Sequence, residues 1–288
     1  MQYKTSIVIP VYNEERSVKS TILGIREVSK KLDEKIEIIA INDSSLDKSG
    51  KILDSIKGIK VIHHNINRGY GASIKTGIKA SKGDWIIIID ADGTYPVKDI
   101  PKFIRLKERY DMVIGNRKKS KANIPLMRRP AKFFLNNFAS YLAGRKIPDL
   151  NCGMRIFNKK KSLEFWNLYP SKFSFTSTIT MSFICNGYKV RYIPIKYYKR
   201  KGKSSISPFD FYNFTQLLLR LTLLFNPLKI FSMISILLFL VGFIIAIYSY
   251  QALGRLMDVT VLLFLLSGLQ VFLFGILAHM MAKYWVKK

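Results

Sequence analysis

Two long segments near the C-terminal end of the chain constrain its fold most, because neither contains Lys, Arg, Asp or Glu. They are residues 230–254 and residues 259–282, the second of which includes His279. Each exceeds the roughly 20 apolar residues that a helix needs to cross a hydrocarbon core. A buried helical pair of a soluble protein is the alternative, although such a pair normally shows a polar face. We expect two transmembrane helices, at about 230–252 and 259–282.

The basic residues orient this hairpin. Lys and Arg are frequent before the first segment, lysines follow the second, and the connecting loop contains one arginine, Arg255. The positive-inside rule then places both termini in the cytoplasm and the hairpin tip outside. Cys152 and Cys185 form no disulfide framework and are typical of reduced thiols. We expect a two-span protein of the cell membrane without a signal peptide, because the first apolar run is short and contains Pro10.

The region before the hairpin alternates between apolar runs and segments of helical periodicity. The predicted strands are 5–11, 36–43, 59–64, 84–90 and 112–117. The predicted helices are 14–32, about 47–57 and about 72–81. Continuous apolar strands that alternate with helices are typical of an α/β fold, a mostly parallel sheet with helices on both faces.

Polar residues follow four of these strands where each strand ends. They are Tyr12, Asn13 and Glu14, then Asp43, then Asn67, Arg68 and Gly69, and finally Asp90 and Asp92. Ligands of such sheets bind beyond the carboxyl ends of the strands. We therefore expect these residues to form one functional rim.

The stretch IIIIDADGTYP, residues 86–96, ends a buried strand in two carboxylates. Asp90 and Asp92 are two positions apart, so they point the same way on an extended chain. They repel each other unless a cation lies between them. Oxygen ligands at a partly open site suit Mg²⁺ or Mn²⁺, which bridge to substrate phosphates. We expect one of these ions as cofactor, bound by Asp90 and Asp92.

The charge balance is strongly basic, with 47 Lys and Arg against 19 Asp and Glu and a formal net charge of +28. Such a balance favours nucleic acid, an anionic membrane surface or a phosphorylated substrate. The strand-end carboxylates argue against nucleic acid, because they repel a phosphate backbone unless metal is present. We expect an anionic membrane and phosphorylated substrates as partners, and no nucleic acid.

Seven short motifs in the first 210 residues resemble the successive motifs of family 2 glycosyltransferases. They are PVYNE (10–14), INDSSLD (41–47), NRGYGASIKTGI (67–78), DADGTYP (90–96), GNR (115–117), DLNCGMR (149–155) and RKGKSS (200–205). The chain is most similar to the polyprenyl-phosphate sugar synthases, which include the dolichyl-phosphate mannose and glucose synthases. The resemblance implies a GT-A fold, a nucleotide-sugar donor, a divalent metal, a polyprenyl (dolichyl) phosphate acceptor and inversion at the transferred hexose.

The resemblance also implies roles for individual residues on the nucleotide side. The implied nucleotide-binding residues are Pro10, Tyr12, Glu14, Asp43, Asn67, Gly69, Lys75, Asp90 and Ala91. Three positions depart from the family pattern. Asn42 replaces the first acid of D-D-G-S-T-D, and the basic motif near 200 ends in Ser204-Ser205 where the family often has Ser-Lys. Thr94 replaces the glutamine of the mannose-type D-A-D-L-Q-H-P, and this departure leans towards a UDP-sugar over GDP-mannose.

A phosphate acceptor needs cations more than it needs a strong base. A phosphate monoester has a second pKa near 6, so it is largely dianionic at neutral pH. Arginine suits phosphate because its planar fork donates several hydrogen bonds. The candidate acceptor-phosphate residues are Arg117, Arg128, Arg129, Arg155, Arg200 and Ser204, and the candidate catalytic residues are Asp92, Arg117 and Arg200. Asp149 is either a base or a structural partner for a nearby arginine.

An amphipathic segment precedes the hairpin. Phe211, Phe214, Leu218, Leu221 and Phe225 recur at helical spacing and form one apolar stripe. We place a cytoplasmic GT-A domain at 1–207, an interfacial helix at 208–228 and the hairpin at 229–288. A second stripe of Phe134, Phe138 and Tyr141 is either interfacial or part of a core helix.

Three other functions compete with this interpretation. A glycosyltransferase that extends a polysaccharide or lipid-linked glycan shares the donor site, but the Q-x-x-R-W motif of processive synthases is absent from the sequence. A basic nucleic-acid-binding membrane protein conflicts with the rim carboxylates. A catalytically inactive scaffold is disfavoured by Asp90 and Asp92. Association of the chain with itself is left open.

Overall fold

The computed structural model describes residues 3–117, 129–171, 174–198, 209–254 and 257–286. It divides into two compact units, Met1–Asp210 and Phe211–Lys288. Each unit is described by itself below.

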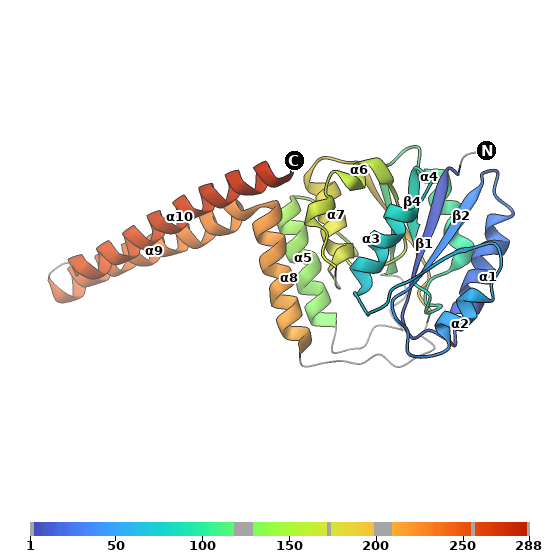
Figure 1. Cartoon of the computed structure of the whole chain (residues 1–288). Coiled ribbons are helices and arrows are strands. Elements are labelled where there is room, and N and C mark those ends of the chain that lie inside the picture. The colour runs from blue at the N-terminus through green and yellow to red at the C-terminus, as the bar shows by residue number, and fades with distance from the viewer. Residues whose placement is uncertain (1–2, 118–128, 172–173, 199–208, 255–256, 287–288) are drawn as a thin grey trace. The chain divides into compact units, whose positions relative to one another are not determined.

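The first unit is built on one seven-stranded sheet of order β3-β2-β1-β4-β6-β5-β7 (Figure 1). The strands are β1 (Thr5–Val11), β2 (Ile36–Asn42), β3 (Lys60–His63), β4 (Trp85–Ile88), β5 (Met112–Asn116), β6 (Arg155–Asn158) and β7 (Val190–Pro194). The central strand β1 is parallel to both of its neighbours, with Ile7 opposite Ile38 on β2 and Ile87 on β4. The predicted α/β class, with a mostly parallel sheet, is confirmed.

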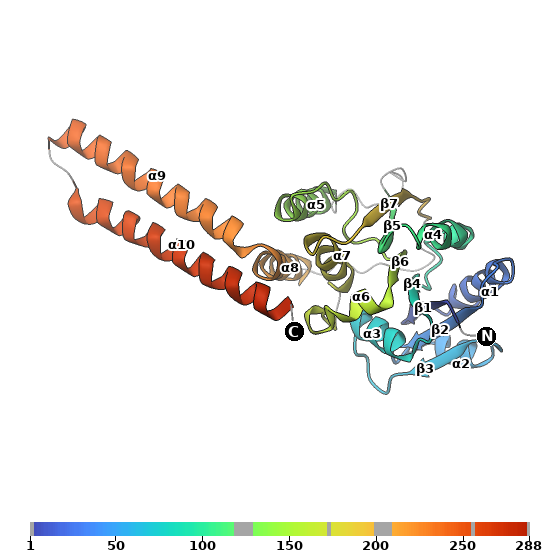
Figure 2. The same ribbon diagram turned by 90° about the horizontal axis from the view of Figure 1, so that it is seen from above.

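Helices cover both faces of the sheet, so β1, β2 and β4 are buried along nearly all of their length. The helices are α1 (Val18–Ser29), α2 (Ser49–Asp54), α3 (Tyr70–Ala80), α4 (Ile100–Leu106), α5 (Arg129–Ala143), α6 (Lys159–Leu163) and α7 (Phe175–Cys185). Figure 2 shows α1 and α4 on one face and α3 and α7 on the other. Helix α3 packs closely because of Gly77, where an added Cβ would lie 2.3 Å from Val8 Cγ1.

The far half of the sheet differs from the prediction. The strand predicted at 112–117 is β5, but β6 lies between it and β4 and is antiparallel to both. Neither β6 nor β7 was predicted. Strand β6 is four residues long and begins with an arginine, so it lacks the continuous apolar run that marked the other strands. The described part of the unit also contains the short 3-10 helices η1 (Val97–Asp99) and η5 (Trp166–Leu168).

The second unit contains two long antiparallel helices preceded by α8 (Phe209–Phe225). Helix α9 (Pro227–Leu253) ends at Gly254, whose φ of 63° is a left-handed cap, and α10 is Asp258–Val286. By length and composition both can cross a membrane, since 18-residue windows within Pro227–Ala252 and Asp258–Tyr284 have mean hydropathies of 2.9 and 2.5. Most of their apolar residues are exposed, as expected for helices solvated by lipid.

Glycines and a serine bring the two long helices together. An added Cβ at Gly275 would lie 2.5 Å from Phe231 Cβ, and one at Gly268 would lie 3.1 Å from the Phe239 ring. Ser235 Oγ donates a hydrogen bond of 2.7 Å to the Gly268 carbonyl. Small residues that admit a neighbouring side chain are typical of helix pairs in membranes.

Candidate active site

The loops after β1 and β2 are joined at the rim by hydrogen bonds. Asn13, in the left-handed region with a φ of 54°, accepts from the Leu46 backbone N–H at 2.8 Å and donates through its own N–H to Ser45 Oγ at 3.1 Å. The Glu14 N–H donates to Ser49 Oγ at 2.8 Å, and Glu14 Oε2 accepts from Ser17 Oγ at 3.1 Å. These bonds fix the segment that carries Glu14.

Two predicted nucleotide residues flank this segment. Pro10 is half-buried near the end of β1, and Tyr12 is exposed just beyond it. Both therefore lie at the carboxyl edge of the central strand, where ligands of parallel sheets bind.

Asp43 is buried and organises the loop that leads into α3. Its carboxylate accepts hydrogen bonds from the Arg68 N–H at 2.9 Å and the Gly69 N–H at 2.8 Å, and it lies 2.6 Å from His64 Nδ1. Gly69 has a φ of 92°, which explains a glycine there. Asn67 in this loop is exposed. The structure thus brings Asp43 and Gly69 together. His64, the partner that holds the Asp43 carboxylate, was not predicted as a site residue.

Lys75 lies one and a half turns into α3 and contacts η5 and the residues after it. Its Nζ donates to the Tyr169 carbonyl at 3.2 Å and lies 4.9 Å from the centre of the Trp166 ring. These contacts hold α3 against a distant segment of the chain. Binding of the nucleotide by Lys75 stays a prediction.

Asp90 and Asp92 follow β4, as predicted, and each is held by a neighbouring hydroxyl. Asp90 Oδ1 accepts from the Tyr70 hydroxyl at 3.0 Å. Asp92 Oδ1 accepts from the N–H and the hydroxyl of Thr94, at 3.0 and 2.6 Å. Ala91 between them is buried, and its carbonyl accepts from Thr21 Oγ1 at 3.2 Å.

The surroundings of Asp90 change its pKa. Burial, and next the charge of Asp92, raise the pKa of Asp90 to about 7. The Tyr70 hydrogen bond and the positive charges of Arg117 and Arg155 act in the opposite direction. A carboxylate with a raised pKa beside a second carboxylate is a site where a cation would be favourable.

The donor set fits a hard divalent cation. Both side chains offer oxygen atoms only, which suits Mg²⁺ or Mn²⁺. Among the described residues, no group of three or more His, Cys, Asp or Glu gathers to enclose a metal. Two protein carboxylates would leave positions for water and for the oxygens of a diphosphate, so the residues fit an open site.

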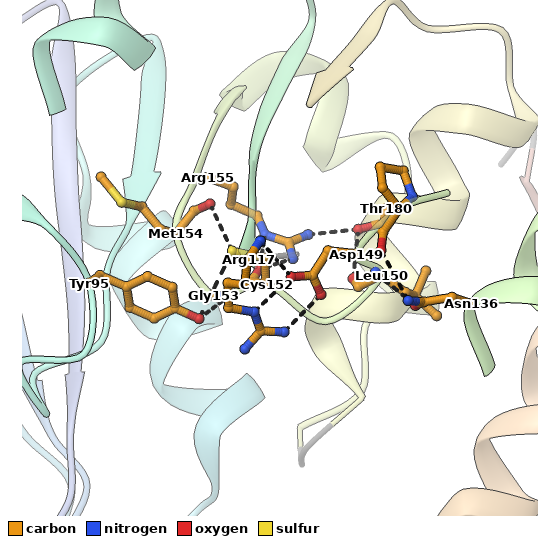
Figure 3. Close-up of polar contacts among 11 residues, drawn as sticks. Tyr95, Arg117, Asn136, Asp149, Leu150, Cys152, Gly153, Met154, Arg155 and Thr180 are labelled. Atoms are coloured by element: carbon orange, nitrogen blue, oxygen red, sulfur yellow. Dashed lines mark hydrogen bonds and ion pairs between the residues drawn. The ribbon is translucent and has the colours of Figure 1, made fainter. Parts of the chain in front are cut away.

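Arg117, at the end of β5, forms a two-pronged ion pair with Asp149 (Figure 3). Its Nε lies 2.7 Å from Asp149 Oδ2 and its Nη2 lies 2.8 Å from Oδ1. Asp149 is fully buried and also accepts from the Arg117 N–H at 3.2 Å. The Tyr197 ring lies 5.2 Å from the guanidinium carbon. Of the two roles considered for Asp149, the structure supports the structural partner.

The prediction that Arg155 contacts the acceptor phosphate is corrected by its burial. Arg155 is fully buried in β6, and its guanidinium donates to the Cys152 carbonyl, to the Thr176 carbonyl at 2.9 Å and to Thr180 Oγ1 at 2.8 Å (Figure 3). A side chain with no exposed surface and three protein acceptors cannot also hold a substrate phosphate in this conformation.

The side chains of the other predicted acceptor-phosphate residues are not described. Arg128, Arg200 and Ser204 lie outside the described residues, and Arg129 begins α5 without a described side chain. Their roles stay predictions.

An open pocket of about 340 Å³ adjoins the loop after β4. Its lining comes from the start of α1 and from that loop: Ser17, Ser20, Thr21, Gly93, Tyr95, Pro96, Val97, Lys98 and Tyr198. Sequence patterns did not single out Tyr70, Tyr95 or Gly153, which contact the site acids or their neighbours. Only their positions inside the motifs at 67–78, 90–96 and 149–155 could have suggested them.

Two family models match the chain. Residues 6–166 match "Glycosyl transferase family 2", and residues 226–283 match "GtrB C-terminal hairpin". The first match covers more than half of the chain, and the second covers the two apolar helices.

Curated relatives include transferases named for prenyl-phosphate acceptors. The dolichyl-phosphate hexose transferase of Haloferax volcanii is 27% identical over 206 residues, which cover 71% of this chain and 87% of that protein. The undecaprenyl-phosphate 4-deoxy-4-formamido-L-arabinose transferase of Proteus mirabilis is 32% identical over 161 residues, 54% of this chain and 49% of that protein. The alignment thus spans about half the length of the Proteus protein.

A solved structure supports the fold. Glucosyl-3-phosphoglycerate synthase from Mycobacterium tuberculosis, in complex with Mn²⁺, UDP and phosphoglyceric acid, matches with a TM-score of 0.60 at 14% identity, over 76% of this chain and 78% of that one. At this identity the match establishes a GT-A-like sheet and no more. With the family match, it follows that the chain is a glycosyltransferase and belongs to glycosyl transferase family 2.

Proposed function

We propose that the chain transfers a hexose from a nucleotide sugar to a polyprenyl phosphate at the cytoplasmic face of a membrane, with Mg²⁺ or Mn²⁺. The observation that carries the proposal is the combination, in one chain, of paired carboxylates at a GT-A rim and a two-helix apolar hairpin. Relatives named for dolichyl and undecaprenyl phosphate support the acceptor class.

On the nucleotide side, the loops after β1, β2 and β3 would receive the nucleoside. Glu14 would bind ribose hydroxyls, and the loop fixed by Asp43 would lie beside the base. Asp90 and Asp92 would hold the metal, which supplies positive charge to the leaving diphosphate. Thr94 stands where the mannose-type motif has a glutamine, and its hydroxyl donates to Asp92. Because of this departure from the mannose-type motif, we favour a UDP-sugar as donor.

On the acceptor side, an anionic phosphate oxygen would attack the anomeric carbon. The bond from that carbon to the donor phosphate breaks as the new bond forms, so a single displacement inverts the configuration. Arg117 would steer the acceptor, since its pairing with Asp149 fixes the orientation of its fork. Arg128, Arg129, Arg200 and Ser204 are proposed as further phosphate contacts. Catalysis would then rest mainly on positioning and electrostatics.

The membrane arrangement is part of the proposal. We propose that α9 and α10 cross the bilayer with both termini in the cytoplasm, because basic residues flank them on that side. An amphipathic α8 would lie in the interface. The acceptor head group would then be presented near the rim.

The test uses the purified full chain in detergent with Mn²⁺ and a short polyprenyl phosphate. UDP-Glc, UDP-GlcNAc, UDP-Gal and GDP-Man are supplied separately, and sugar-lipid formation is followed by mass spectrometry. We expect product from one donor and a loss of at least roughly 10³-fold in Asp92→Ala, since the diphosphate would lose its metal. The matched control is Asp84→Ala, an exposed acid at the opposite end of β4. Polymer without sugar-lipid would instead indicate glycan extension, and full activity of Asp92→Ala would refute the metal assignment.

A further inference from the structure

Residues 149–155 connect the two halves of the site. Asp149 at the start of this segment pairs with Arg117, and Gly153 near its end lies against Asp90 (Figure 3 shows the segment). The segment therefore contacts both a proposed metal ligand, Asp90, and a proposed acceptor arginine, Arg117.

The contact at Gly153 is close. A Cβ added there would lie 2.6 Å from Asp90 Oδ2 and 3.1 Å from its carboxyl carbon. The Gly153 N–H donates to the Tyr95 hydroxyl at 2.8 Å, so the backbone is held where it meets the carboxylate. The Tyr70 hydroxyl bonds the other oxygen, Oδ1, at 3.0 Å. The Asp90 carboxylate is thus bounded by a hydroxyl at one oxygen and by bare backbone at the other.

The buried Arg155 also holds this segment, through hydrogen bonds to its backbone. Its Nε and Nη2 both donate to the carbonyl of Cys152, the residue immediately before Gly153. Its Nη1 donates to Thr176 and Thr180 in the first turns of α7. The guanidinium therefore ties the peptide beside Gly153 to a helix whose residues Phe175 to Ile184 are all buried.

We propose that Gly153 and Arg155 are positioning residues for Asp90, and that they set the carboxylate geometry on which binding of the divalent cation depends. The inference rests on the proposed metal-dependent function. Gly153 supplies a surface that only a residue without a side chain can offer, and Arg155 keeps that surface at a fixed distance. Neither residue touches substrate or metal.

The alternative is that Arg155 and Gly153 only stabilise the core. Measurement of Mn²⁺ binding distinguishes this alternative from a positioning role. The full chain in detergent is titrated with Mn²⁺, with and without UDP, and free Mn²⁺ is measured by electron paramagnetic resonance. We expect Gly153→Ala to weaken Mn²⁺ binding at least tenfold while its melting temperature stays within a few degrees of the unchanged chain. Gly24→Ala is the matched control, since a Cβ there meets only Val97 at 3.8 Å, and it should bind Mn²⁺ normally.

Three further variants cover the case in which Gly153→Ala does not fold. Tyr95→Phe removes only the hydroxyl that holds the Gly153 N–H, and we expect Mn²⁺ binding to weaken about threefold to tenfold. Arg155→Lys keeps the charge and should retain more Mn²⁺ affinity than Arg155→Met. Normal Mn²⁺ binding by folded Gly153→Ala or by Tyr95→Phe would overturn the positioning role and leave the proposed function standing. Absence of Mn²⁺ binding by the unchanged chain would overturn the metal assignment, and this inference with it.

Discussion

The two halves of the sheet build their parts of the site in different ways. In the half formed by β3, β2, β1 and β4, all strands run parallel, and polar residues simply follow the strand ends. In the half formed by β6, β5 and β7, one strand is reversed, and the site arginines Arg117 and Arg155 are engaged by other groups of the protein. The first half can be interpreted from local patterns, whereas the second depends on tertiary contacts.

The two halves of the sheet also differ in the charged residues that they bring to the site. The half formed by β3, β2, β1 and β4 gathers acids at its strand ends, and burial together with the charge of Asp92 raises the pKa of Asp90. The far half gathers arginines whose charge is engaged by protein groups, a carboxylate for Arg117 and carbonyl and hydroxyl oxygens for Arg155. A basic composition therefore does not reveal which arginines face a ligand.

The strongest test of the far half is Asp149→Ala. Removing one partner of a buried ion pair leaves the other charge uncompensated, which typically costs about 3–5 kcal/mol of stability. Arg117 would also lose its orientation, and we expect kcat for sugar-lipid formation to fall more than roughly 100-fold. Steady-state kinetics and thermal unfolding measure both effects. Unchanged kcat in a folded variant would show that Arg117 needs no fixed orientation.

The corresponding test of the half formed by β3, β2, β1 and β4 is Asp43→Asn. The amide keeps the size of the side chain but presents an N–H group towards backbone N–H donors at Arg68 or Gly69. We expect a loss of about 1–3 kcal/mol in stability and roughly tenfold higher KM for the nucleotide sugar, with little change in kcat. An effect on kcat alone would place the loop in the chemical step instead. The matched exposed variant is Asp54→Asn, near the end of α2.

Asp90→Asn sharpens the charge comparison. The folded chain holds a proton on Asp90 more tightly than the unfolded chain, because the folded pKa is raised to about 7. The metal-free protein should therefore lose stability as the pH rises from about 4 to about 7. The asparagine variant should remove this loss and be more stable at pH 8 by roughly 1–3 kcal/mol, although it cannot bind Mn²⁺. Thermal unfolding of both proteins in chelator, at about pH 4 and at pH 8, measures this difference in stability. A variant with the same pH dependence of stability as the unchanged chain would contradict the prediction.

The smallest effect on catalysis is expected in the second unit. Gly275→Leu places a side chain where a Cβ already approaches Phe231 to 2.5 Å, and overpacking of this kind costs about 1–3 kcal/mol. We expect the hairpin to unfold at lower denaturant concentration, while transfer in detergent changes less than about twofold. Leu277→Ala, an exposed position on α10, is the control. A large loss of transfer would mean that the hairpin contributes to the reaction itself.

The sequence predicted strands β1 to β4 and the acids that follow them because these signals are local. Asp90 and Asp92 directly follow an isoleucine run, and β1 and β4 are continuous apolar segments. It misjudged Arg155, since a charged residue in a polar motif was taken as exposed, and only tertiary packing buries it. His64 and Gly153 were missed for the same reason. Their partners, Asp43 and Asp90, are distant in the chain, and no periodicity marks such a pair.

The reversed strand β6 has a consequence for how this chain acquires its shape. It pairs with β4 across a long intervening segment, matching Ile156 to Ile87. Closing so long a loop costs entropy before any contact repays it, and such distant pairings form slowly. The strands β3, β2, β1 and β4 can pair with one another first. The segment around Gly153 reaches Asp90 only after β6 has paired with β4. We therefore expect the contact between Gly153 and Asp90 to form late in folding, after β3, β2, β1 and β4 have paired.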